Sequence, residues 1–344
     1  MTPARPGPDP AGERGQGWRE RWPTTASVLV SVLLAPALVY GLTSSSAYRG
    51  YPHEVVVTSR AQDVLTAFVL PLLVWTSVRA RRGSLSAHVA WLGLLFYLAY
   101  SYALYLVGWQ QNRAFLVYAV VVTLSVAALL DGVGRIDVRA VQPAVRGLRT
   151  RALGWFLVVV GTLFVGLWLS DVAPSTWGGR PPGHLGPGGT PYAVYVLDLT
   201  VALPVVIVVG VLKIRSHPMA AVLGGVVLVK VLTLFTALWL GVLAALVGGE
   251  HVGFTADMVP SAVLLLVTAT ALVTWHRRAA RPGSGWLRVR LWPSVLPGPD
   301  IAAPADEASP AGGSFTERIA RQVPAHTHGL DSSSSPDSGG RPTR

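Results

Sequence analysis

The chain has 344 residues, of which 51% are hydrophobic and only 13% are charged. Soluble proteins average about 25% charged residues, so this composition excludes an ordinary soluble domain. The net charge of +11 alone would suit nucleic acid, but the basic residues flank long apolar segments. That placement indicates membrane topology and contact with anionic lipid headgroups at the inner leaflet, not nucleic-acid binding.

Eight apolar segments follow one another along the chain, each bounded by charged residues, Gly or Pro. Each has about 18 residues or more, and about 20 residues of helix cross a hydrocarbon core of about 30 Å. The segments run over about 26–43, 61–78, 85–107, 114–131, 152–170, 193–212, 219–247 and 258–276. The sequence therefore predicts an all-α, polytopic integral membrane bundle of eight transmembrane helices within residues 26–276.

The two ends of the chain have few apolar residues to bury. Residues 1–25 are rich in Pro, Gly and Arg, and residues 277–344 include the run SSSSPDSGG. We expect both to be mostly disordered cytoplasmic tails. The first apolar segment resembles a signal peptide in its basic lead. Its apolar core is longer than the apolar region of a signal peptide, which usually has about 7–15 residues. We therefore expect this segment to remain as a transmembrane span.

Basic residues orient the spans. With both termini inside, the inner segments near the membrane carry nineteen Lys and Arg residues and the outer loops carry four. This asymmetry predicts cytoplasmic termini. Abundant Ala, Gly, Pro and Arg further suggests a GC-rich genome.

Two connecting segments are long. The inner one, about 132–151, has apolar residues at three- and four-residue intervals among arginines. It predicts either an amphipathic helix on the inner leaflet or a solvated basic loop. The outer one, 171–192, contains WGGRPPGHLGPGG, where Gly and Pro disfavour regular structure. We interpret it as a tether or a mobile flap, with a tether favoured.

No catalytic or cofactor-binding signature is present in the sequence. Histidines and carboxylates do collect on the predicted outer face, but they come from separate loops and lack ligand spacing. They are His53, Glu54, Asp63, Asp171, His184, Glu250, His251 and Asp257. We predict no catalytic residues, no cofactor and no metal site.

Tyrosines mark the third apolar segment. Tyr97, Tyr100, Tyr102 and Tyr105 lie there, and Tyr97 and Tyr105 share one helical face with Ser101. A phenol at membrane depth needs a hydrogen-bond partner. The tyrosines therefore predict either a polar cavity lined by hydroxyls or interhelical hydrogen bonds that only fix packing.

Ionisable residues inside the lipid depth are rare and often functional. Asp198 lies about 9 Å below the outer boundary of the sixth span, and Lys230 lies about 14 Å below it on the seventh. Asp63 lies nearer the outer edge of the second span. We predict that Lys230 faces the bundle interior and pairs with Asp198, either in a functional polar site or as a structural ion pair.

Two stretches carry a resemblance. YVLDLT (Tyr195–Thr200), followed by Pro204 and then by LVK ending at Lys230, is similar to a bacterial family of multi-span integral membrane proteins. The four tyrosines, followed by Gly108, Asn112 and Phe115-Leu116, are similar to it as well. The likeness covers most of residues 60–250, and it departs at Arg215-Ser-His-Pro218, where a fuller arginine run is expected. The resemblance implies a fold and a multi-pass location in the bacterial plasma membrane, and it implies no activity.

Two functions fit these features. The first is a carrier or permease-like protein with a polar site formed by Lys230, Asp198, Asp63, Tyr97, Tyr100 and Tyr105 that takes a small molecule or a proton. The second is a non-enzymatic scaffold or accessory subunit of another membrane complex. A carrier predicts a water path to Lys230, whereas a scaffold predicts a dry Lys230 and an exposed apolar groove. A membrane enzyme ranks third.

The orientation can be tested because the chain has no native cysteine. We expect Ser45→Cys and Ser175→Cys to react with a membrane-impermeant thiol reagent in intact cells, and Ser335→Cys to be protected, because the charge asymmetry places only the first two outside. Labelling of Ser335→Cys, or protection of Ser175→Cys, would reverse the predicted topology.

Overall fold

The computed structural model describes residues 10–108, 112–137, 151–178, 192–249 and 258–279, with only the backbone at 10–20. These residues form α1 (Pro10–Thr43), α2 (His53–Arg81), α3 (Leu85–Gly108), α4 (Phe115–Gly134), α6 (Arg151–Gly178), α7 (Tyr192–Leu197), η2 (Asp198–Ala202), α8 (Leu203–Ile214), α9 (Pro218–Val247) and α10 (Met258–Ala279). The segments α7, η2 and α8 are consecutive and make one span. The described residues thus contain eight helical spans long and apolar enough to cross a membrane, which confirms the predicted all-helical integral membrane fold.

Several helices extend past their apolar segments. α2 begins at His53 and α6 ends at Gly178, each eight residues beyond the predicted span. Hydropathy marks only the part of a helix inside hydrocarbon, whereas polar residues continue the helix at either end. α1 begins at Pro10, inside the segment 1–25 predicted to be disordered. The Glu, Gln and Arg residues that follow Pro10 are good helix formers.

Other predictions fall on residues that the structure does not describe. These are most of the inner segment 132–151, the greater part of the outer segment 171–192, and all but the first three residues of 277–344. The described helices all belong to the first of the two units into which the chain divides, Met1–Ser294. The orientation of the termini stays a prediction.

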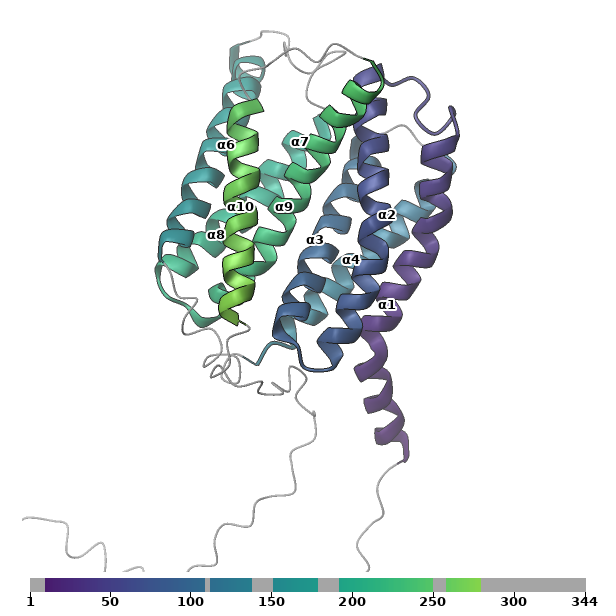
Figure 1. Cartoon of the computed structure of the whole chain (residues 1–344), viewed down its shortest axis with the longest axis vertical. Helices are drawn as coiled ribbons and strands as arrows, with labels where there is room; N and C mark the ends of the chain where they lie inside the picture. The colour runs from purple at the N-terminus through teal and green to yellow at the C-terminus, as the bar shows by residue number, and fades with distance from the viewer. Residues whose placement is uncertain (1–9, 109–111, 138–150, 179–191, 250–257, 280–344) are drawn as a thin grey trace, which may run out of the picture. The chain divides into compact units, whose positions relative to one another are not determined.

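α3 lies at the centre of the helical unit. It contacts α2, α4, α7, α9 and α10, and 78% of its most apolar 18-residue stretch is buried, against 17% for α6 and for α10. α9 contacts α2, α3, α8 and α10, and Figure 1 shows it between the first four helices and the group of α6, α8 and α10. The third and seventh spans, which carry the tyrosines and Lys230, therefore meet in the interior.

Glycines permit the closest helix contacts, as expected where lipid supplies little hydrophobic drive for helix association. α6 packs on α8 with Gly154 facing Gly210. A Cβ atom on Gly154 would lie 2.8 Å from the carbonyl oxygen of Gly210, and one on Gly210 would lie 2.9 Å from that of Gly154. α3 approaches α9 in the same way, because a Cβ atom on Gly93 would lie 3.0 Å from the carbonyl oxygen of Val226.

The α6–α8 contact makes a testable prediction. Gly210→Ala should lower the free energy of unfolding by about 1–3 kcal/mol, a typical cost of overpacking, because the new methyl group would lie 2.8 Å from Cγ2 of Val158. The matched control is Gly166→Ala in α6, where no atom lies within 4 Å of the new methyl group. Both variants gain the same helix propensity. Thermal unfolding of the purified proteins measures the difference, and equal stabilities would contradict the close approach.

Candidate functional site

Lys230 is buried in the interior of the bundle. It lies on α9 within an apolar stretch, and its side chain is only 4% exposed. Its Nζ atom lies 4.0 Å from the centre of the Tyr100 ring on α3. An ammonium over an aromatic face is stabilised by the ring quadrupole, and the stabilisation grows to about 2 kcal/mol or more when the pair is desolvated. The prediction that Lys230 faces the interior is confirmed.

Asp198 receives hydrogen bonds from two aromatic side chains. The Tyr100 hydroxyl donates to Oδ1 at 2.6 Å, and the Trp168 indole N–H on α6 donates to Oδ2 at 2.9 Å. Both carboxylate oxygens therefore have a donor at membrane depth, where an unpaired one would be costly. Lys230, Tyr100, Asp198 and Trp168, which we call the Lys230 cluster, come from four different spans.

A local break in the sixth span positions Asp198. Residues Asp198–Ala202 form one turn of π-helix, and the N–H of Leu203 donates to the Asp198 carbonyl, five residues earlier. Pro204 has no N–H, so the α-helical pattern cannot continue normally at this point. Single π-turns inside α-helices are frequent at functional sites.

The predicted direct ion pair between Lys230 and Asp198 is wrong. The Lys230 Nζ atom and the Asp198 carboxylate oxygens lie farther apart than 4.0 Å, the limit for a salt bridge. Tyr100 contacts both, with its ring beneath the amine and its hydroxyl on the carboxylate. The prediction rested on the similar depths of Asp198 and Lys230 in the sixth and seventh spans and took no account of a third helix. α3 contacts both α7 and α9, and its phenol links the two charges.

The Lys230 amine donates no hydrogen bond to any described residue. An ammonium has three donors and no acceptor, and desolvating it without compensation is expensive. The ring of Tyr100 offsets part of that cost but accepts no conventional hydrogen bond. The amine is therefore suited to an incoming acceptor, either water or an anionic or carbonyl group of a small molecule.

The other three predicted site residues have different partners. Asp63 on α2 is buried and accepts a hydrogen bond from the Tyr48 hydroxyl. Tyr97 shares a hydrogen bond of 2.9 Å with Thr66, and Tyr105 donates to the carbonyl of Ser59 at 3.3 Å. The contacts of Tyr97 and Tyr105 join α3 to α2 and favour the structural interpretation of these two tyrosines.

Tyr48 keeps its proton beside Asp63. Burial, and next the nearby carboxylate, raise the pKa of the Tyr48 phenol well above its ordinary value. The hydroxyl therefore stays a donor over the physiological pH range. The Asp63 side chain also packs directly against Gly41 of α1, so this carboxylate is closed in by protein.

Sequence reasoning missed Trp168, Tyr48 and Thr66. Trp168 had a usable signal, since an indole N–H within an apolar span needs an acceptor, and Asp198 on the next span was an obvious one. Tyr48 lies in a connecting segment and Thr66 is a small hydroxyl that often bonds its own helix, so neither stood out. Among the described residues, no group of three or more His, Asp or Glu side chains is placed to hold a metal ion.

No family model, curated protein or solved structure matches the chain. The resemblance noted for residues 60–250 therefore has no support from a family match.

The Tyr100–Asp198 contact can be tested against a second buried phenol. Tyr100→Phe should lower the free energy of unfolding by about 1.5–3 kcal/mol, because it removes a hydrogen bond to a charged group. Tyr97→Phe should cost only about 0.6 kcal/mol, the average for interhelical bonds in membranes. Thr66 keeps its own bond to the Gln62 carbonyl in that control. Thermal unfolding compares the two, and equal losses would contradict the special role of Tyr100.

Proposed function

We propose that the protein is a carrier of the bacterial plasma membrane whose ligand-binding site is the Lys230 cluster. The observation that carries the proposal is a buried lysine amine without a hydrogen-bond acceptor among the described residues. It lies beside a carboxylate that two other side chains already satisfy. The ligand is a small molecule with an anionic or carbonyl acceptor, or a proton.

The division of roles within the cluster supports this proposal. Tyr100 and Trp168 occupy the two oxygens of Asp198, so Asp198 is held in place and the lysine is the group with unused donors. Because Lys230 makes no direct ion pair with Asp198, its amine can bind a ligand without first breaking such a pair. A purely structural lysine would be expected to donate to the carboxylate directly.

The break at Asp198 also supports a carrier. Transporters commonly bind ligands where a spanning helix is interrupted and several helices meet near mid-membrane. Here the π-turn contributes Asp198 to the cluster, and the other three members come from α3, α6 and α9. Because the groups come from four spans, a shift of one span changes the environment of the ligand.

The test is whether water reaches Lys230. In native membranes, Lys230→Cys should react with a small charged thiol reagent at least about tenfold faster than Leu228→Cys, because only a hydrated thiol ionises and reacts. Leu228 lies two residues away on α9 and is fully buried. The chain has no other cysteine. Equally slow reaction at both positions would contradict a carrier.

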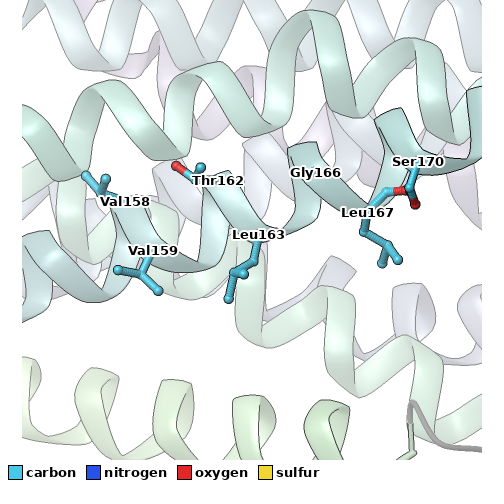
Figure 2. Close-up of a pocket in the computed structure, with 7 residues that line it drawn as sticks. All are labelled: Val158, Val159, Thr162, Leu163, Gly166, Leu167 and Ser170. Atoms are coloured by element: carbon cyan, nitrogen blue, oxygen red, sulfur yellow. The ribbon is translucent and has the colours of Figure 1, made fainter. Parts of the chain in front are cut away.

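A scaffold or accessory subunit is the second candidate, and the lipid-facing side of α6 favours it. Trp155 is 57% exposed and Leu163 is 67% exposed. Figure 2 shows Val159, Leu163 and Leu167 along one side of α6. These residues line an open pocket of about 720 Å³. An apolar helix of another membrane protein fits this face. Equally slow labelling at Lys230 would favour this candidate.

A further inference from the structure

A second groove lies between α6 and α10, at the end of α10 that carries Arg277 and Arg278. It has a volume of about 500 Å³. Its lining residues are Ala152, Leu153, Leu266, Val267, Thr270, Ala271, Thr274, Trp275 and Arg278. Most are apolar, and the one charged residue is at the membrane-surface end.

The floor of the groove is fixed by Trp275. Its ring is 2% exposed, and its indole N–H donates to the carbonyl of Ala221 on α9 at 2.9 Å. The ring packs on Gly225 so closely that a Cβ atom there would lie 2.9 Å from it. The groove is therefore built on a held aromatic side chain and is not a gap between loosely packed helices.

Three polar groups of the groove have no hydrogen-bond or ionic partner among the described residues. They are the Arg278 guanidinium and the hydroxyls of Thr270 and Thr274. Thr123 and Thr236, on other spans, donate instead to the carbonyl four residues earlier. The spacing 270, 274 and 278 places all three groups along one face of α10, so they can serve one elongated ligand.

We propose that this groove binds one anionic phospholipid, with its phosphate at Arg278 and an acyl chain along the apolar wall. From Leu266 to Arg278 the helix rises by twelve residue steps, about 18 Å, which matches one leaflet of a hydrocarbon core of about 30 Å plus the start of the headgroup layer. Arg151, which precedes the lining residue Ala152, is exposed and adds positive charge at the same end. This proposal is independent of the carrier function.

The charge requirement is tested with adjacent arginines. The full chain is purified with phosphatidylglycerol and phosphatidylcholine, and retained lipid is counted by native mass spectrometry. Arg278→Gln should lower the preference for phosphatidylglycerol about fivefold, as expected for one basic residue near a membrane surface. Arg277→Gln should change it less than twofold, because Arg277 does not line the groove. Arg278→Lys should retain most of the preference.

The groove itself is tested by filling it. Ala271→Phe should remove the retained phosphatidylglycerol, whereas Val273→Phe, on an exposed face of the same helix, should not. Monodisperse elution and unchanged thermal unfolding verify that each variant is folded. Equal effects of Arg278→Gln and Arg277→Gln would show only diffuse attraction and overturn the proposal. Retention of lipid by folded Ala271→Phe would overturn it as well.

Discussion

The hydrogen bond from Tyr100 to Asp198 is the contact on which the interior of this protein depends. It joins the central helix α3 to the π-turn of the sixth span, and it holds the ring of Tyr100 beneath Lys230. Trp168 then attaches α6 to the same carboxylate. In a low-dielectric interior a charged acceptor with two donors is stabilised, and one that loses a donor is penalised. A single buried carboxylate thus specifies how four spans meet.

The two buried aspartates show opposite arrangements. Asp63 is enclosed by Tyr48 and Gly41, and its surroundings contain aromatic contacts such as Tyr48 with Tyr105 at 6.3 Å. No buried cation contacts it among the described residues. Asp198 instead lies near a lysine whose donors are unused. Protein alone satisfies the first site, which is typical of a structural role, whereas the unused donors at the second are the basis of the ligand site that we propose.

The fold could be predicted from the sequence because apolar segment length is nearly sufficient to define a membrane helix. The burial of Lys230 followed from the same cost of exposing charge to lipid. The direct ion pair did not follow, since depth along two helices says nothing about a third helix between them. The π-turn at Asp198 depends on how the neighbouring helices pack around that point, and sequence periodicity does not contain this information.

α6 is held by a tight glycine contact in one part and by side-chain hydrogen bonds in another. Glycine contacts such as Gly154 with Gly210 fix the α6–α8 pair. α6 meets the Lys230 cluster through Trp168, fourteen residues beyond Gly154. Beyond the glycine contact, two hydrogen bonds attach α6 to the sixth span, one from Trp168 to Asp198 and one from the Tyr195 hydroxyl to Asp171 at 3.2 Å. Releasing the bond to Asp198 so that this end of α6 can move costs about 1.5–3 kcal/mol for a charged acceptor. Ligand binding at Lys230 can supply energy of this size. The same carboxylate that organises the resting bundle would then also sense the ligand.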